Sequence, residues 1–523
     1  MTMNMKNILK NIFLGALAAI MLLSCNMELT PFGSIVYDPD EPLILTETDV
    51  VSFQNGVMAR YRSLHYGGHY YASELMCDGF NAVRGYGNNY GTIHMAGADF
   101  TPSNQEIEGI WGAHYTAIKD YNIAIANADR VPEELKSSAG ILKGMALFCR
   151  ASSYLHLARH WGLVYNPNTA DTDLCVPLVL EYDQMLVPER ATVKQVYDQI
   201  FEDLNTAEGL LAMVPGVVRS QYPTLDAVRA LKARYYLDVQ DFEKAVDYAD
   251  AVITSAANYA LASTEAQMHL EYTAETGTEP IMQLYSSMTE GLVGNTYYLG
   301  TDIDESTKFF SPYYIPTKAL ITSYDKSDIR LKSWYCLTDD AMVDANTKLT
   351  PTEKPVYPLK IEGSYYGGVY VFQKYRGNPA LYSSNAKVES GAHSAKTLLI
   401  SEMYLIAAEA AARDSKEGIA KTYLNALQKA RQAVNTEGTL DDVKKEWFRE
   451  TVGEGMRLAC IKRWGDGISA RTEQDGADDL VMPGTGFAER EMPANSHVFN
   501  WPIPTYEIQI HPNLIQNPNY ESE

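Results

Sequence analysis

Several features are scarce in this 523-residue chain, and each scarcity excludes a class of protein. The six cysteines are scattered, with no Cys-x-x-Cys pair, so we expect neither a disulfide framework nor a cysteine-ligated zinc site. Lysine and arginine total 43 against 66 acidic residues, which gives a formal net charge of −23. Because nucleic-acid binding needs a basic surface, this balance excludes a nucleic-acid partner.

The N-terminus contains an apolar run that is too short to cross a membrane. Ile12 to Leu23 is twelve residues long, whereas a spanning helix needs about twenty. The run follows two lysines and ends at Ser24-Cys25 with leucine three residues before the cysteine, the pattern of a lipobox. We therefore predict a lipoprotein signal peptide over residues 1–24 and lipidation of Cys25.

Enzyme motifs are also missing. The chain has no nucleophile elbow, P-loop, HExxH or EF-hand sequence, and the glycine-rich run at 85–91 lacks the Lys-Ser/Thr of a phosphate loop. His65 and His69 lack a third residue nearby that could complete a metal site. Asp302 and Asp304 could suggest the carboxylate pair of a glycosidase, but such pairs are expected by chance among 66 acidic residues. We predict no catalytic residue, no metal and no cofactor.

Helical periodicity is what the chain does have. Apolar residues recur every three or four positions in segments that predict helices at 107–129, 141–162, 192–211, 224–253, 398–434 and 441–464. The 224–253 segment breaks at Gln240-Asp241, and alanines such as Ala233 and Ala249 would let its two halves pack closely. Such a hairpin is typical of tetratricopeptide repeats. The sequence thus predicts a mainly α, tetratricopeptide-like body over about 107–255 and 397–465.

Two segments interrupt this body, at about 62–106 and 257–396. Both are rich in glycine and tyrosine, and the second contains short extended runs at 281–285 and 370–375. Long irregular insertions on a rigid scaffold often carry function, so we expect them to form a ligand-binding face.

Tyrosine dominates the aromatic residues, with 36 against 14 phenylalanines and 6 tryptophans. Aromatic rings stack on the C–H face of sugars, while amide and charged groups bond the hydroxyls. The predicted ligand-binding residues are Tyr70, Asp78, Asn81, Arg84, Tyr86, Asn88, Asn89, Tyr90, Tyr297, Tyr298, Trp334 and Tyr366. The alternative for each ring is that it only packs its loop onto the body.

Several separated motifs resemble the SusD/RagB family of outer-membrane nutrient-binding lipoproteins. They are the lipobox Cys25, Trp111-x3-Tyr115, Gly144 to Gly162, Val176-Pro177-Leu178, Ala230 to Arg234, Glu402-x-Tyr404-Leu405, Glu446 to Gly465, Pro502-Ile503-Pro504 and Gln516-Asn517-Pro518-x-Tyr520. The ordered set spans almost the whole chain after Cys25. One departure is Phe448, which stands where the family often has Arg or Glu.

The resemblance implies a single domain over 25–523, anchored by its lipid to the outer membrane and facing the cell exterior. It also implies capture of an oligosaccharide without cleavage, and delivery to a SusC-like TonB-dependent barrel that would meet the tetratricopeptide-like side. Alternatives are a peptide-binding member of the same family, a tetratricopeptide scaffold that binds only proteins, and a surface glycan hydrolase.

Overall fold

The computed structural model describes residues 41–65, 68–183, 185–290, 300–350, 353–382 and 388–520, with residues 68–70 as backbone alone. The predicted signal peptide and Cys25 lie outside these ranges. All the elements below belong to one compact unit, Ile44–Glu523.

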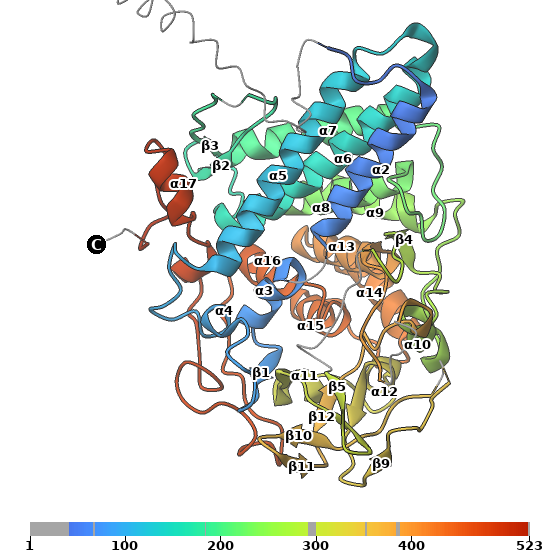
Figure 1. Cartoon of the computed structure of the whole chain (residues 1–523), viewed down its shortest axis with the longest axis vertical. Helices are drawn as coiled ribbons and strands as arrows, with labels where there is room; N and C mark the ends of the chain where they lie inside the picture. Colours follow the sequence, from blue (N-terminus) through green and yellow to red (C-terminus); the bar gives the residue numbers. More distant parts are fainter. Residues whose placement is uncertain are drawn as a thin grey trace, which may run out of the picture. The chain divides into compact units, whose positions relative to one another are not determined.

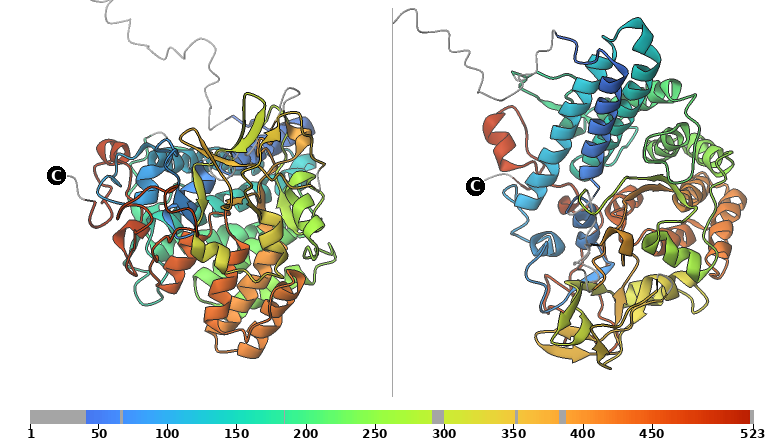
Figure 2. Two further views of the ribbon diagram at one scale, coloured as in Figure 1. Left: turned by 90° about the horizontal axis from the view of Figure 1, so that it is seen from below. Right: turned by 45° about the vertical axis from the view of Figure 1, so that its right-hand side comes forward.

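Helices make up most of the regular structure (Figures 1 and 2). They are α2 (Glu47–Ser63), α3 (Gly68–Met76), α4 (Gly91–Met95), α5 (Gln105–Ala128), α6 (Lys136–Trp161), α7 (Val193–Leu210), α8 (Leu225–Asp238), α9 (Phe242–Ile253), α10 (Glu265–Thr273), α11 (Lys318–Thr322), α12 (Ile329–Trp334), α13 (Ile400–Arg413), α14 (Glu417–Ala430), α15 (Leu440–Glu450), α16 (Arg457–Trp464) and α17 (Thr505–Ile510).

The strands are short and lie mainly in the second insertion. They are β1 (Phe80–Ala82), β2 (Leu174–Pro177), β3 (Arg190–Thr192), β4 (Pro280–Gln283), β5 (Thr301–Asp304), β6 (Thr307–Phe310), β7 (Tyr314–Pro316), β8 (Tyr335–Leu337), β9 (Val343–Asp344), β10 (Leu359–Ile361), β11 (Ser364–Tyr366), β12 (Tyr370–Phe372) and β13 (Lys396–Leu399). One sheet has the order β11-β10-β6-β5 with β9 beside β6, and the others are the pairs β1-β7, β12-β8, β13-β4 and β2-β3.

The predicted helical body is confirmed. Its helices pack in sequence, with α5 on α6, α6 on α7 and α8 on α9, while α13 packs on both α9 and α14. In the α8–α9 hairpin, Ala233 and Ala249 are fully buried and the rings of Tyr236 and Tyr248 stack with centroids 5.2 Å apart. Small residues at the contact let the two helices approach, which is the tetratricopeptide-like geometry that the sequence indicates.

The helix starts follow local sequence. At α7 the Thr192 hydroxyl accepts a hydrogen bond from the Gln195 backbone N–H at 3.2 Å, and the Gln195 side chain accepts one from the Thr192 N–H at 2.8 Å. Thr46 with Asp49 and Thr439 with Asp442 form the same reciprocal box at α2 and α15. Each box satisfies backbone donors that the first helical turn leaves unpaired.

The prediction of one helix over 441–464 is wrong. The chain leaves the helix after Glu450 and re-enters it at Arg457, because Gly453 and Gly455 adopt φ of +75° and +70°. Side chains other than glycine rarely adopt these angles. The break serves packing, since the Gly453 carbonyl accepts a hydrogen bond from the Tyr375 hydroxyl at 3.0 Å.

The first insertion is more helical than its composition indicates. It contains the end of α2, then α3 and α4, where the sequence predicts irregular structure. Leu75 and Met76 on α3 are fully buried, so tertiary packing stabilises a helix whose intrinsic propensity is weak. A second cluster of buried apolar side chains, separate from the helical core, begins here and continues beneath the strands of the second insertion.

The five described cysteines are free and buried, including Cys149 and Cys460, whose predicted place in the core is confirmed. Within the described ranges, none of the helices combines the length and apolar character needed to cross a membrane. The same ranges contain no group of His, Cys, Asp or Glu side chains suited to a metal ion.

Candidate functional site

Strands from distant parts of the chain lie side by side at the lower end of Figure 1. β1 pairs antiparallel with β7, so that Ala82 faces Tyr314. On its other side, Val83 forms an antiparallel bridge with Val481, and the Met482 N–H donates to the Ala82 carbonyl at 2.8 Å. The first insertion, the second insertion and the C-terminal segment therefore meet here.

Gln474 joins this group to β12. Its amide nitrogen donates to the Pro316 carbonyl at 2.8 Å and to the Tyr370 carbonyl at 3.0 Å, while its oxygen accepts from the Tyr370 N–H at 2.8 Å. β12 in turn pairs with β8. We call β8, β12, β7, β1 and the Val481 segment the strand platform.

Half-buried tyrosines lie at the ends of β7 and β12 and of β11, a strand of the neighbouring sheet that precedes β12 in the chain. Tyr313 immediately precedes β7, Tyr370 begins β12, and Tyr366 ends β11 four residues before Tyr370. A half-buried tyrosine keeps part of its ring available for stacking while the rest of the ring is held by packing. Tyr313 and Tyr370 are not in the set predicted from sequence. The repeated tyrosines of both insertions are a signal for them, whereas Gln474 has no local signal because its partners are more than a hundred residues away.

The 83–90 loop packs against β7 through several of its predicted ligand residues. Tyr86 is 7% exposed, with its ring edge-on to Tyr314, and its hydroxyl donates to the Asn88 side-chain oxygen at 3.0 Å. The Asn89 amide donates to the Tyr86 carbonyl at 2.9 Å, and the Asn89 carbonyl accepts from the Tyr314 hydroxyl at 2.5 Å. These bonds fix the loop.

Part of the same loop remains accessible. Arg84 and Asn88 are exposed, and Asn89 and Tyr90 are half-buried. Asn88 and Tyr90 have φ of 57° and 54°, so the backbone passes twice through the left-handed region that asparagine tolerates better than most residues. Together with Tyr366, these four residues are predicted ligand residues whose side chains stay at least partly accessible.

Asp78 is half-buried, and Asn81 is buried. Asp78 accepts two hydrogen bonds of 2.8 Å from Arg457. Burial by itself would raise the pKa of Asp78, but the adjacent Arg457 guanidinium outweighs burial and lowers that pKa below its usual value. Asn81 is fully buried and donates to the Thr472 carbonyl at 3.4 Å. The burial of Asn81 is contrary to the expectation that it contacts a ligand, whereas a ligand contact of Asp78 stays a prediction.

Trp334 is also an interior residue. It is 4% exposed, and the Lys374 ammonium lies 4.0 Å from its ring centroid. Lys374 is held there by a 2.6 Å hydrogen bond to Glu454. One ring face is therefore occupied by a cation and the other is buried, so Trp334 serves packing and does not offer a stacking surface. Tyr297, Tyr298 and the side chain of Tyr70 lie outside the described residues, and their ligand contacts stay predictions.

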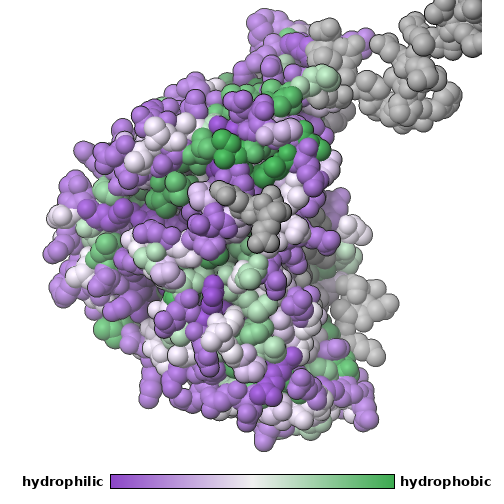
Figure 3. Space-filling model, turned by 90° about the vertical axis from the view of Figure 1, so that its left-hand side faces the viewer, coloured by the Kyte–Doolittle hydropathy of each residue, from purple (hydrophilic) through white to green (hydrophobic). Residues whose placement is uncertain are grey.

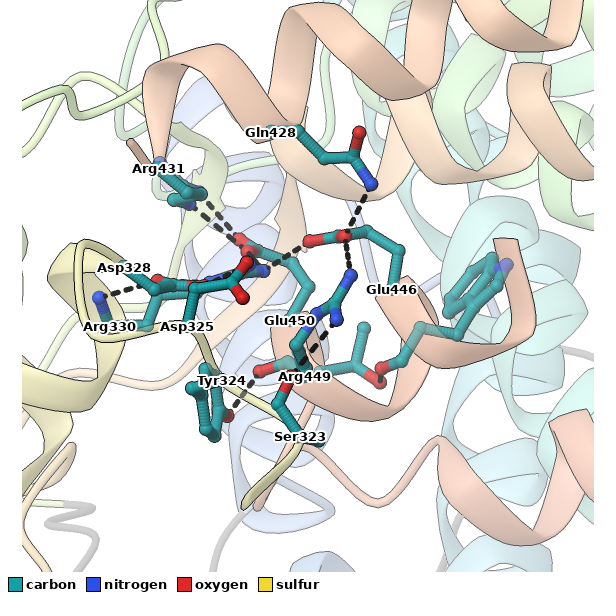
Figure 4. Close-up of polar contacts among 12 residues, drawn as sticks. Ser323, Tyr324, Asp325, Asp328, Arg330, Gln428, Arg431, Glu446, Arg449 and Glu450 are labelled. Atoms are coloured by element: carbon teal, nitrogen blue, oxygen red, sulfur yellow. Dashed lines mark hydrogen bonds and ion pairs between the residues drawn. The ribbon is translucent and has the colours of Figure 1, made fainter. Parts of the chain in front are cut away.

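A buried ionic network fixes the second insertion to the helical body (Figure 4). Arg330 on α12 bonds Asp328 at 2.7 Å, and on α15 it bonds Glu446 at 2.5 Å and Glu450 at 2.8 Å. Glu450 also accepts from Arg431 at 2.5 Å, and Arg431 reaches Glu279 at 2.7 Å.

Every carboxylate in this network has at least one arginine partner. Burial would raise the pKa of Glu450, but Arg431 and Arg330 lower it to about 2. Glu446 also has its pKa lowered, since Arg330 and Arg449 outweigh its burial. The ion pairs hold α12, and with it the start of β8, in one position against α14 and α15.

The fold and the platform define a class of protein: a tetratricopeptide-like helical body whose insertions build a tyrosine-bearing face. Family models give the finer assignment. A SusD-like model described as starch-binding associating with outer membrane matches residues 38–237, and the model of the SusD family matches residues 251–520. The chain belongs to the SusD family.

Individual relatives agree with this assignment. SusD-like protein P2 of Formosa agariphila is 29% identical over 159 residues, a match that spans 30% of this chain and only 29% of that relative. A SusD superfamily protein from Bacteroides vulgatus is 24% identical with a TM-score of 0.71, over 92% of this chain and 100% of the other. Surface glycan-binding protein A from Bacteroides thetaiotaomicron, solved in complex with laminarihexaose, is 20% identical with a TM-score of 0.67, over 91% and 100%. The two structural matches show the shared fold.

Proposed function

We propose that this protein captures oligosaccharides at the cell surface and releases them uncleaved to a transporter. The observation that carries the proposal is a set of half-buried tyrosines in a SusD-family chain. Tyr313 and Tyr370 lie at the strand platform, and Tyr366 lies on β11, four residues before Tyr370. Their rings supply stacking surfaces. The exposed Arg84 and Asn88 lie on the 83–90 loop that packs against β7, and they supply hydrogen-bond donors and acceptors for hydroxyls.

The net charge narrows the ligand class. At −23, the protein repels strongly sulfated or uronic glycans and leaves neutral ones unaffected. Capture without cleavage fits the absence of enzyme motifs from the sequence. A peptide-binding member of the family is the alternative, because tyrosine and asparagine side chains also suit a peptide backbone.

Calorimetric titration of the chain from Asn26 onward tests this function. We expect binding to one class of neutral oligosaccharide, without product, and none to sulfated glycans or to a peptide pool.

Replacing Tyr370 or Tyr313 with alanine should each cost about 0.5–1.5 kcal/mol of binding free energy, the value of a stacked ring. Tyr506→Ala is the matched control, since Tyr506 is an exposed tyrosine on α17, outside the platform. If the peptide pool gave a heat of binding and no oligosaccharide did, the result would contradict glycan capture and support the peptide-binding alternative.

The proposed location is the outer membrane, by a lipid on Cys25, with the protein facing outward. The lipobox supports the anchor, and the description of the SusD-like model as associating with outer membrane supports the compartment. Mass spectrometry of the N-terminal peptide from outer-membrane extracts tests the anchor, and an unmodified Cys25 would contradict it.

An exposed apolar patch supports the proposed TonB-dependent barrel partner. Figure 3 shows apolar side chains gathered in the upper part of an otherwise mostly hydrophilic face. On that side, Arg190 at β3 donates to the Ile515 carbonyl at 3.0 Å, which holds the β2–β3 connection beside the C-terminal segment. The exposed apolar side chains of these two segments are Leu180, Met185, Val187, Ile510 and Ile515. Contiguous exposed apolar surface of this kind marks protein interaction sites.

The double variant Met185→Asp, Ile515→Asp tests this partner. We expect it to lose co-purification with the barrel from outer-membrane extracts, because two charges would be buried without partners at the contact. Met213→Asp introduces a charge at an equally exposed methionine outside the patch and should leave co-purification unchanged. Retention of the barrel by the double variant would place the interface elsewhere.

A further inference from the structure

A cleft on the helical side of the molecule has the features of a second ligand site. It lies between α2, the connection from α7 to α8, and the segment that follows β4, and its volume is about 460 Å³. Pockets for small molecules are typically about 300–1,000 Å³. The right-hand view of Figure 2 brings forward the side of the molecule on which the ribbons of α8 and α9 lie. None of the residues that line the cleft belongs to the strand platform.

Two tyrosine rings are displayed in this cleft. Tyr222 is 41% exposed and Tyr285 is 48% exposed. The two tyrosines follow segments that run parallel to each other. Ser220 and Met282 form a parallel β-bridge, and the Gln283 N–H donates to the Ser220 carbonyl at 2.9 Å. The backbone therefore brings the two segments together, and both tyrosine side chains line the same cleft. The Tyr222 hydroxyl donates to the Asn55 side-chain oxygen on α2 at 3.2 Å, which ties that ring to the opposite element.

The charges in the cleft are already balanced. Arg62 donates to Glu290 at 3.3 Å and to the Tyr285 carbonyl at 3.4 Å, and its guanidinium carbon lies 5.7 Å from the Tyr285 ring centroid. An anion would have to compete with Glu290 for the one arginine. Gln221 and Asn55 add exposed amides at the rim. Rings next to amides and a neutralised arginine match the C–H face and hydroxyls of an uncharged sugar.

We infer that the Tyr222–Tyr285 cleft is a second carbohydrate-binding subsite, which takes a neutral oligosaccharide independently of the strand platform. This inference rests on the proposed glycan-binding function. Two separate subsites on one chain would let a long glycan be held at one point while another part of it is released.

Tryptophan reporters separate the two sites. Tyr285→Trp and Tyr370→Trp preserve a stacking ring and place a fluorophore at the cleft or at the platform, in the chain from Asn26 onward. Each is titrated with maltohexaose, cellohexaose, laminarihexaose and xylohexaose. We expect a saturable change in the emission of the Tyr285→Trp variant with one of these glycans. Adding Tyr222→Ala to that variant should weaken its apparent affinity about three- to tenfold, and adding Tyr506→Ala should not.

The outcomes distinguish the two claims. A response from Tyr370→Trp alone would overturn the cleft and leave the proposed function standing. A response from neither reporter would overturn both. A response from Tyr285→Trp that Tyr222→Ala does not weaken would overturn the pairing of the two rings. Thermal melting of every variant confirms that each stays folded at the titration temperature.

Discussion

Replacing Arg431 with methionine is expected to lower the free energy of unfolding by about 3–5 kcal/mol, the usual cost of removing one partner from a buried ion pair. The Arg431 side chain is fully buried. It donates to both oxygens of Glu279, to both oxygens of Glu450 and to the Ala262 carbonyl at 2.7 Å. Methionine would fill much of the volume of the arginine side chain. Glu279 would lose its arginine partner and Glu450 would lose one of its two, while both carboxylates stay buried. Urea unfolding followed by circular dichroism measures the loss.

Lys421→Met is the control for this substitution. Lys421 forms an ion pair of 2.7 Å with Glu437 at the surface, where both side chains are well exposed. Such pairs contribute about 0–1 kcal/mol, so this variant should unfold almost like the wild type. Equal destabilisation by the two variants would mean that the buried network does not hold the insertion.

Replacing Trp334 with alanine is expected to destabilise the protein by about 3–5 kcal/mol, the range for removing a large buried aromatic side chain. Its ring lies in the core of the second insertion, and its loss would also remove the cation–π contact that Lys374 makes at 4.0 Å. Glycan affinity of the folded fraction should be unchanged, because the ring faces the interior. Chemical unfolding together with calorimetry well below the melting temperature separates the two effects.

Tyr366→Ala should behave in the opposite way. Tyr366 is half-buried on the edge strand β11, so its removal should change the unfolding free energy little while weakening glycan binding. If Trp334→Ala instead abolished binding by a protein that unfolds like the wild type, Trp334 would be a ligand contact after all.

The helical body could be predicted from the sequence because its determinants are local. The apolar spacing of α5 to α9, the Thr192 cap and the alanines of the α8–α9 contact all act within a few residues or one hairpin. The break between α15 and α16 was missed because its glycines interrupt an otherwise regular pattern. Gly453 lies against Tyr375, 78 residues away, and a side chain at Gly453 would collide with that ring.

The candidate site could be predicted only as far as its segments. The excess of tyrosine and asparagine located the 83–90 loop and the second insertion, but composition does not say which ring is covered. Trp334 resembles a stacking residue in sequence, yet it lies under Lys374. Tyr370 and Gln474 could not be predicted as part of the platform, because the hydrogen bonds that join them connect residues 104 positions apart in the chain.

By itself, the sequence determined the helical repeats and the family, since periodicity, caps and ordered motifs are readable along the chain. It also indicated the two segments in which we propose the ligand face. Only the tertiary structure decided which side chains of those segments are accessible, where the strand platform forms and that Tyr222 and Tyr285 share a cleft. The physical reason is that accessibility depends on contacts between residues far apart in the chain, and a linear pattern does not record those contacts.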